Sequence, residues 1–529
     1  MPIDVNNCQQ TRATLSLAGN QALFRRTQNN DFYSIVPSPY FTYYQNWVRV
    51  DLAWYDGYVP WIHGGTNGLL STGIGTSIVN RCADSVFGGS LMFKNARNPQ
   101  DKKNGIGVAL DFISNKWMNE TDGEQVIKKT ARNALAGGFS ALKLNNAGGA
   151  LWLDGLRADR FYADLSHGKV MKFGCALAFF NGMTSKEDQT RYVLIEERRF
   201  ENLGLFEKIP VVEYKMYATS APIQFYQGKG HENFIPWEQL PKIVRSAFKE
   251  QYGSMMLNKP QALNGFSDLG VYILNASDGI SAIPDLEFGE SILNNVETYL
   301  YEYDYWNTAL NTEMYLSRGR VIVPKRFISP LAEMAGSRPN GLDEFLYTEC
   351  DASPNGEPNK PQPVQFELHA EQFRSIRDTL LQCIAAGIGI SVSTLASYLN
   401  DGGAQKTAHQ VDSETDATTK WVEAMRRRFE KPINAMLAQV LRFYGYTDDV
   451  EVRWTRAGFT NQSELVTTLS AAINAGMISR KKAHHQFNID EDEEQNEQDY
   501  KQVLEEEKAR NQSEKENLWD FGDKEEVDG

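Results

Sequence analysis

The segment Gly402–Thr407 is glycine-rich and ends in lysine and threonine, so its residues could bind phosphate. This composition is found in phosphate-binding loops. Such a loop needs a glycine directly before the lysine, so that backbone N–H groups can surround the phosphates, and it follows a buried strand. Here Gln405 precedes Lys406, and the segment before it is polar. The spacing therefore disfavours a nucleotide-dependent enzyme, an alternative that would hydrolyse ATP or GTP through Lys406.

Histidine and cysteine show no metal-binding pattern. The seven histidines include no HxxxH or HExxH spacing, and the five cysteines include no CxxC pair. His484 and His485 indicate a polar helix face and not a metal site. The carboxylates of 490–494 indicate a solvated tail. No GxSxG motif of a serine hydrolase occurs. We expect no catalytic residue, no metal site, no cofactor and no enzymatic activity, and we expect reduced, mostly buried thiols.

Charge is unevenly distributed along the chain. The formal net charge is −14, but residues 490–529 hold 17 acidic and 5 basic residues, which leaves the rest at −2. Proteins that grip DNA usually carry a basic excess, because neutralised phosphates supply most of the affinity. We therefore expect no tight non-specific DNA binding, although a conduit through which DNA slides is compatible. Arg426–Arg428 indicate a solvated or intersubunit face, or alternatively a contact with DNA or a partner.

Length and composition limit the number of subdomains and the class of protein. A chain of 529 residues exceeds one hydrophobic core, so several subdomains are expected. With 41% hydrophobic and 11% aromatic residues, real cores are possible. No apolar run approaches the roughly 18 residues that span a bilayer. The Met1 end lacks a secretory signal. We expect a protein of the cytoplasm, or of a particle assembled there, with no membrane contact.

The first half of the chain predicts a loose arm, then helices, then a sheet. Residues 1–30 are polar, and 39–86 and 105–136 have helical spacing. Five short β-like runs follow, with turns at 146–149 and 166–168, and indicate an antiparallel meander: Phe139–Leu144, Leu151–Leu156, Val170–Phe180, Arg191–Arg198 and Lys208–Ala218. Residues 235–264 return to helix and loop.

Two amphipathic helices bracket a Pro-rich excursion in the second half. Ser291–Arg318 would be roughly 42 Å long as a helix that ends at Gly319. The strand Arg320–Pro324 and the Pro-rich stretch follow, and helix resumes over His369–Ala386. This order indicates a helical stem that carries a small module at its tip.

A third long helix, Thr407–Tyr444, follows the stem. Gly387 and Gly389 end the second stem helix, and Ile390–Lys406 forms a loop whose apolar residues could also pack as a short helix. Pro432 should kink the third helix, because it removes a backbone donor and clashes with the preceding turn. A strand at 449–455 and two helices are expected next, Ser463–Ala475 and Ile478–Phe487, the second with Ser479 as N-cap.

From about residue 280 onward the order of parts resembles the portal proteins of long-tailed bacteriophages. The segment Gly387–Ser393 (GIGISVS), followed by a loop and Lys406–Val411 (KTAHQV), is similar to the family pattern that opens the long kinked helix. Ala475–Ser479 (AGMIS) before a Glu-rich helix resembles a C-terminal signature of the family. The junction Leu316–Pro324 and the aromatic-acidic stem Tyr299–Tyr305 are also similar.

The resemblance implies an α+β multi-domain portal fold, mainly α, with long stem and channel helices, a mixed α/β wing, a small α/β clip and a helical crown. The implied parts are wing 1–285 with arm 1–30, stem helices 286–318 and 369–389 around clip 319–368, tunnel loop 390–406, kinked helix 407–446, crown 447–516 and acidic tail 517–529.

The resemblance also implies a function: a ring, usually dodecameric, that conducts double-stranded DNA at one capsid vertex during packaging and ejection. Its implied partners are further copies, DNA, the large terminase subunit, a head-tail connector or adaptor, and the major capsid and scaffolding proteins. Expected DNA-facing residues of the tunnel loop are Ser397, Asn400, Asp401, Gln405 and Lys406. Expected partner-binding residues of the clip are Lys325, Arg326, Arg338, Glu344 and Phe345. A different virion structural protein, such as a tail or connector adaptor, is the alternative.

Overall fold

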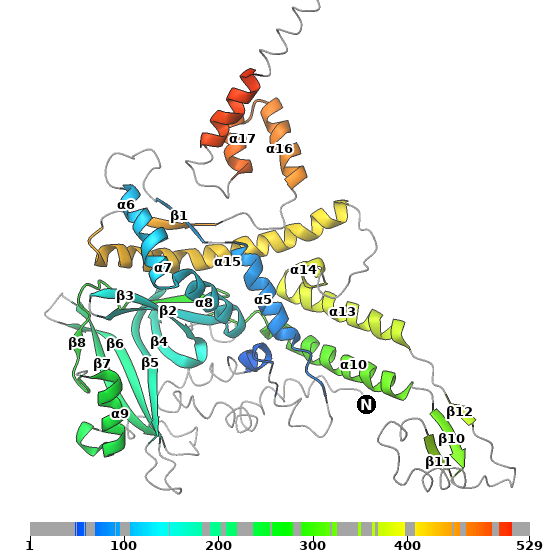
Figure 1. Ribbon diagram of the computed structural model, residues 1–529, viewed down its shortest axis with the longest axis horizontal. Helices are drawn as coiled ribbons and strands as arrows, with labels where there is room; N and C mark the ends of the chain where they lie inside the picture. The colour runs from blue at the N-terminus through cyan, green and yellow to red at the C-terminus, as the bar shows by residue number, and fades with distance from the viewer. Residues whose placement is uncertain are drawn as a thin grey trace, which may run out of the picture.

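The computed structural model shows a mixed helical and stranded protein, in which the two larger sheets lie together at one end and two long helices run from there toward a small sheet at the other (Figure 1). The residues that the structure describes are 48, 50–57, 59, 69–89, 91–95, 106–147, 149–181, 191–202, 208–219, 236–253, 256–278, 287–317, 320–324, 347–350, 362–364, 369–396, 408–446, 449–454, 462–488 and 497–509. The predicted arm, residues 1–30, lies outside them.

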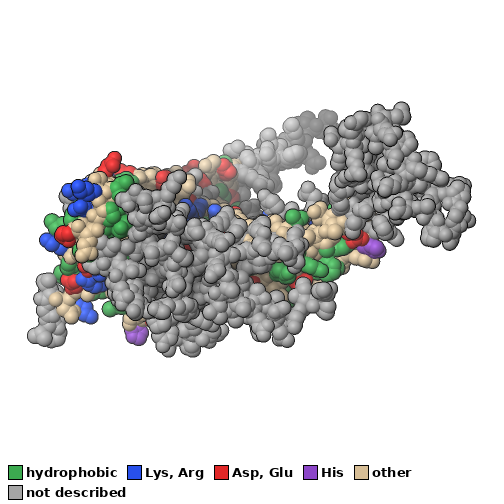
Figure 2. Space-filling view, turned by 90° about the horizontal axis from the view of Figure 1, so that it is seen from below, with side chains coloured by type: hydrophobic (Ala, Val, Ile, Leu, Met, Phe, Trp, Pro, Cys, Tyr) green, Lys and Arg blue, Asp and Glu red, His purple; other side chains and the backbone are tan. Residues whose placement is uncertain are grey.

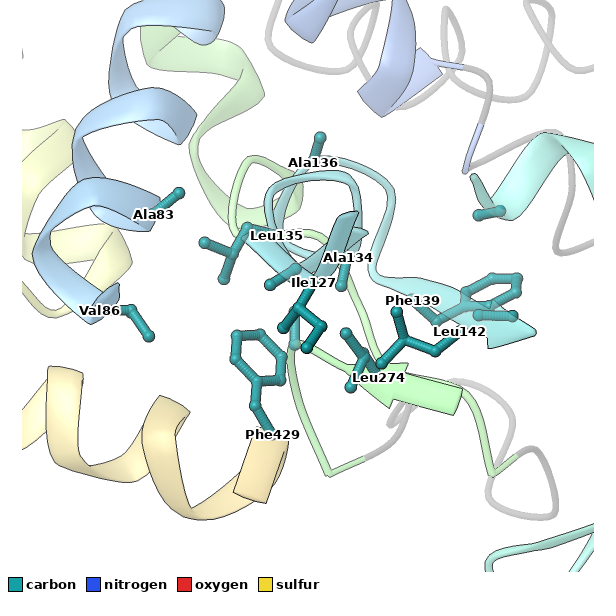
Figure 3. Packing of buried hydrophobic residues seen from close by; sticks show 14 of the residues in the cluster. Ala83, Val86, Ile127, Ala134, Leu135, Ala136, Phe139, Leu142, Leu274 and Phe429 are labelled. Atoms are coloured by element: carbon teal, nitrogen blue, oxygen red, sulfur yellow. The ribbon is translucent and has the colours of Figure 1, made fainter. Parts of the chain in front are cut away.

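The main core forms where helices pack on a three-stranded antiparallel sheet. Its strand order is β3-β2-β9, with β2 Phe139–Ala147, β3 Ala150–Arg157 and β9 Val271–Asn275. Helix α8, Gly123–Gly137, packs on β2 and β3 and also contacts α5, Ile74–Phe87. Figure 3 shows Ile127 and Leu135 of α8 close to Phe429 of the long helix α15, Ala408–Phe443, while Ala83 and Val86 of α5 face the same core. This shared core joins segments that are about 350 residues apart in sequence, because each buries one apolar face.

A second, five-stranded antiparallel sheet has the order β4-β5-β6-β7-β8. Its strands are β4 Phe161–Ser166, β5 Lys169–Asn181, β6 Arg191–Asn202, β7 Lys208–Thr219 and β8 Gln261–Ala262. Helix α9, Lys242–Tyr252, follows the short turn η5, Trp237–Gln239, and covers part of the sheet with a small core of its own. The last three of the five predicted runs form the consecutive antiparallel strands β5, β6 and β7, but the first two belong to the three-stranded sheet, so the prediction of one continuous meander was wrong. Strand β4 was not predicted, because its first three residues are all buried and do not alternate.

The two helices of the predicted stem are α10, Glu297–Leu316, and α13, Ala370–Ile388. Between them lies a small sheet of order β11-β10-β12, in which β10 (Arg320–Pro324) pairs parallel with β11 (Tyr347–Cys350) and antiparallel with β12 (Gln362–Val364). The expected start of the first stem helix at Ser291 was wrong. The Ser291 hydroxyl instead binds the carbonyl oxygen of Ala136 at 2.7 Å, and the turn η6, Asn294–Val296, precedes the helix.

Helix α14, Val392–Ala396, and the long helix α15, Ala408–Phe443, follow the stem. Gly389 ends α13 in a left-handed conformation (φ 87°), whereas Gly387 lies inside the helix, so the expected stop at Gly387 was wrong. Strand β13, Val450–Arg453, pairs antiparallel with β1, Met92–Asn95. The remaining short elements are α6 Ile106–Asp111, the π-helical turn η3 Phe112–Trp117, α7 Met118–Glu120 and η4 Ala158–Arg160.

The C-terminal module consists of α16 (Gln462–Asn474), α17 (Arg480–Phe487) and a further helix over 497–509. Ser479 is the N-cap of α17 and accepts a hydrogen bond from the N–H of Lys482, as the sequence predicts. In Figure 1 the module stands apart from the sheets, beyond α15.

Candidate functional site at the root of the loop

The two stem helices form an antiparallel hairpin. At one end the ring of His369 lies 2.8 Å from the Glu313 carboxylate. Further along, the rings of Trp306 and Phe373 meet edge to face with centroids 6.0 Å apart. At the other end Gly387 packs directly on Val296, where an added Cβ would lie 2.5 Å from a Val296 methyl. Contacts along the whole length therefore confirm the expectation that these helices run side by side.

The α10 helix is also bound by the segment that precedes α5. Asp304 is buried and accepts a hydrogen bond from the backbone N–H of Thr72 at 3.0 Å and another from the Thr72 hydroxyl. One turn later, the Thr308 hydroxyl accepts from the N–H of Leu70 at 3.0 Å. These bonds compensate the desolvation of a buried carboxylate. The first stem helix is thus held on two sides.

The α13 helix, in contrast, keeps one side exposed. Along the line of this side the exposed positions recur at helical spacing and carry no positive charge, whereas Arg374, one residue before Ser375, is an exposed cation of the same helix. One acidic residue, Glu371, lies at the end near the small sheet. The others are uncharged: Gln372, Ser375, Thr379, Gln382 and Ala386. This uncharged stripe, defined by those five residues, extends along most of the helix.

A cluster of three hydroxyl groups fixes the start of the segment that follows the stem. The N–H of Ser391 donates to the Thr418 hydroxyl at 2.9 Å, and the Ser391 and Thr394 hydroxyls lie 2.8 Å apart. The Thr394 and Thr418 hydroxyls are 3.0 Å apart, and all three residues are buried. Arg81 of α5 adds a bond to the Thr394 carbonyl oxygen at 3.0 Å. Stem, α5 and α15 therefore meet at the root of the predicted tunnel loop.

The predicted DNA-facing and clip residues fall outside the described residues. These are Ser397, Asn400, Asp401, Gln405 and Lys406 of the loop, and Lys325, Arg326, Arg338, Glu344 and Phe345 of the clip. Gly319 and the phosphate-loop-like segment also lie outside. Pro432 lies within α15, and a kink at this residue stays a prediction.

Two residues of the arginine run Arg426–Arg428 are used within the chain. Arg426 is buried, donates to the Val86 carbonyl oxygen at 2.7 Å and lies over the Trp454 ring. Arg428 forms an ion pair with Asp278 at 2.6 Å, and its hydrogen bond lowers the pKa of that carboxyl. Arg427 is exposed and pairs with Glu423 at 3.4 Å. Contact with DNA or a partner therefore remains open only for Arg427.

A buried ionic cluster between the two sheets was not predicted. The Lys143 ammonium lies 3.1 Å from one oxygen of Glu196, and Nε of Arg198 lies 2.6 Å from the other. Burial raises the pKa of Glu196, but the two cations outweigh it and hold that pKa at about 2. The same arginine donates to the carbonyl oxygens of Leu144 and Leu269, so its charge also binds the sheet edge. The charged run Glu196–Arg199 inside a β-like segment could have indicated this buried ionic cluster.

The thiol beside this cluster is not an activated nucleophile. Cys175 lies 3.7 Å from Lys143, but burial raises the pKa of its thiol to about 11, so it is neutral at pH 7. Cys82 and Cys175 are buried free thiols, as expected. Within the described ranges no group of acidic, histidine and cysteine side chains could hold a metal ion. None of the described helices is long and apolar enough to cross a membrane.

On the face shown in Figure 2, basic and acidic side chains of the described residues lie interspersed over the end that holds the large sheet. The described residues of this face therefore form no continuous basic patch of the kind with which proteins grip nucleic acid.

Comparison with known proteins points in one direction. A family model described as phage portal protein, SPP1 Gp6-like, matches residues 183–514. A search of curated proteins finds no match. One similar solved structure is the neck of a native GTA particle computed with C12 symmetry, with 11% identity, a TM-score of 0.39, and coverage of 81% of this chain and 92% of that chain. That likeness is too distant to support a functional statement.

Proposed function

Because the chain belongs to the SPP1 Gp6-like phage portal protein family, we propose that twelve copies form a ring that conducts double-stranded DNA at one capsid vertex. The ring serves both packaging and ejection. The family is structural, so the chain acts by shape and surface, and no chemical step is required of it.

The observation that carries the proposal is the family match together with the anchored stem hairpin. Two helices packed antiparallel, with α10 fixed to the segment before α5, make a rigid rod. A head-to-tail interface repeated by such rods closes into a ring if its rotation divides the circle. The hydroxyl cluster at the loop root supports a tunnel loop over 390–406 with a fixed origin.

The charge distribution supports sliding of DNA. Duplex DNA carries one negative charge per about 1.7 Å of its axis. The uncharged stripe of α13 offers the phosphates no cation, so DNA that passes it finds no strong resting position. A conduit must let DNA move in both directions, and a stripe without basic residues permits this.

The same proposal assigns a role to each remaining part of the chain, and partners to the clip and the wing. The segment 319–368 acts as the clip, which binds the large terminase subunit during packaging and a head-tail connector afterwards. Residues 1–285 with 407–446 act as the wing, which contacts the major capsid and scaffolding proteins. Residues 447–516 act as the crown, and 517–529 as an acidic tail.

Electron microscopy of the purified full chain tests the ring. We expect two-dimensional class averages with a central pore, a flared end and a narrow end. A second outcome, non-ring particles that bind to a tail assembly, would favour the alternative of a tail or connector adaptor. A monodisperse monomer or dimer at assembly concentrations, with no pore on a symmetry axis, would contradict the proposal.

A further inference from the structure

Helix α9 and the turn η5 form a small lobe at the end of the large sheet. Val244 and Phe248 of α9 are buried, and they pack on sheet residues in a hydrophobic cluster that is separate from the main core. In Figure 1 this lobe lies at the opposite end of the molecule from the small sheet β11-β10-β12 that follows the stem. The outer surface of the lobe is therefore remote from the stem.

One side of α9 carries three cations. Lys242, Arg245 and Lys249 are three and four residues apart, so they line up along the helix. Among the described residues, none of the three forms an ion pair. Two acidic residues are close in sequence, Glu238 in η5 and Glu250, which lies about 100° around the helix from Lys249. Because neither of them pairs with the cations, the basic side keeps its charge for another molecule.

The same lobe exposes apolar side chains. Ile243 of α9 is 54% exposed, and Met256, just after the helix, is 56% exposed. The Lys249 ammonium lies 5.9 Å from the centroid of the half-buried Trp237 ring. Tryptophan, methionine and arginine are the residue types in which protein–protein interfaces are enriched. The lobe therefore has the composition of a protein-binding surface with a basic side, which Arg245 shares.

The cations favour an anionic partner, and the apolar side chains favour a polypeptide over DNA. Three cations neutralise only about three phosphates, which makes a weak and salt-sensitive contact with a duplex. The exposed side chains of Ile243 and Met256 would gain nothing from a phosphate backbone. Against an acidic and partly apolar protein surface they leave water, which is favourable.

The place of the lobe favours a different protein over a second copy of this chain. In the proposed ring the stem lies at the channel, so the lobe, at the other end of the molecule, lies at the outer rim (Figure 1). Neighbouring subunits of a ring diverge with distance from its axis. At a capsid vertex the outer rim faces the shell that surrounds the ring.

We propose that the basic side of α9 binds an acidic, partly apolar surface of the major capsid protein at the rim of the ring. The inference rests on the proposed function, and it adds which face of the wing holds the shell and which charge that shell surface carries. The contact should weaken as salt rises, because exposed charge pairs are screened.

Photo-cross-linking in assembled heads tests the contact. Ser246 of α9 is exposed and lies next to the basic side, and in the full-length chain it is replaced by the photo-reactive amino acid p-benzoylphenylalanine. Irradiation should join it to an acidic segment of the major capsid protein, which mass spectrometry of the adduct identifies. The matched control carries the same amino acid at Thr379, an exposed residue of α13, and should give no adduct with the shell.

Charge reversal tests whether the cations make the contact. Lys242→Glu/Lys249→Glu should lower both the yield of the adduct and the number of rings per head by at least about tenfold, because like charges would face each other. Purified rings of this variant should form as in the wild type. The control Lys116→Glu/Lys169→Glu makes the same change of charge at exposed lysines of η3 and β5, and should leave both measurements near wild type.

The outcomes separate this inference from the proposed function. An adduct with a second copy, with a scaffolding protein or with DNA would overturn the inference, and so would a capsid adduct that survives the charge reversal. Rings that enter heads without any adduct at Ser246 would also overturn it, and they would leave the ring standing. If no ring forms at all, the proposed function fails first and the inference falls with it.

Discussion

At the residue scale, the buried cluster of Lys143, Glu196 and Arg198 shows how charge can lock two sheets together. Two cations share one carboxylate, and both terminal nitrogens of Arg198 donate to backbone or amide oxygens. A buried ion pair contributes little relative to an apolar core, but removal of one partner is costly, because it leaves a charge unpaired in a medium of low polarity. Glu196 is therefore the most sensitive member.

Glu196→Gln should lower the free energy of unfolding of the unassembled chain by about 3–5 kcal/mol. The matched control is Glu201→Gln, whose carboxylate is 39% exposed beside Arg199 and should cost about 1 kcal/mol or less. Urea unfolding measures both, and equal losses would contradict the assignment.

The pH dependence of the same variant follows from the lowered pKa. The folded-state pKa of Glu196 is about 2, against an ordinary 4.5. Its contribution is complete above the ordinary value and is lost as pH falls toward about 2. The stability difference between wild type and Glu196→Gln should therefore shrink across that window and stay constant above it.

The sequence predicted the contacts of some residues and not of others. It predicted the Ser479 cap, because capping is local. It could not predict that Ser391 and Thr394 would meet Thr418, since a hydroxyl signals no partner 24 residues away. It also read Arg426–Arg428 as one face, whereas burial of Arg426 depends on the position of Val86 in an earlier helix.

At the element scale, Gly387 inside α13 packs directly on Val296, the residue just before α10. The long helices followed from their hydrophobic period, with boundaries shifted by tertiary bonds such as that from Ser291 to α8, whereas β4 has no alternating period and was missed. The close contact between the two helices does not follow from a hydrophobic period, but a glycine within a helix can indicate it. A glycine inside a helix costs about 1 kcal/mol relative to alanine, so its presence at 387 indicates a steric need.

Gly387→Ala should destabilise the chain by about 1–3 kcal/mol, because the new methyl would overlap the buried Val296 side chain. In a Val296→Ala background the same change should become stabilising by about 1 kcal/mol, since only the helix propensity remains. A double-mutant cycle measured by thermal unfolding checks this reversal. The same sign in both backgrounds would rule out the proposed overlap.

At the scale of the whole molecule, the order of parts identified the family, but the geometry of assembly was beyond sequence reasoning. A single chain shows which helix faces are covered, and α13 is the stem helix with an open, uncharged side. In a ring, every side chain on that stripe is repeated in each copy. A small change in charge on one chain is therefore multiplied by the number of subunits.

Ser375→Lys/Gln382→Lys should convert the proposed conduit into a DNA-retaining ring. With twelve copies it adds 24 cations along the stem, and each phosphate neutralised steepens the fall of log K with log salt by about 0.9. The matched control, Gln239→Lys/Gln251→Lys, adds the same charge at exposed positions beside and on α9. Fluorescence anisotropy of a labelled duplex at several salt concentrations should show tighter, strongly salt-dependent binding for the stem variant and a smaller change for the control. If both variants bind DNA alike, the stripe does not lie along the DNA path, and net charge alone governs the interaction.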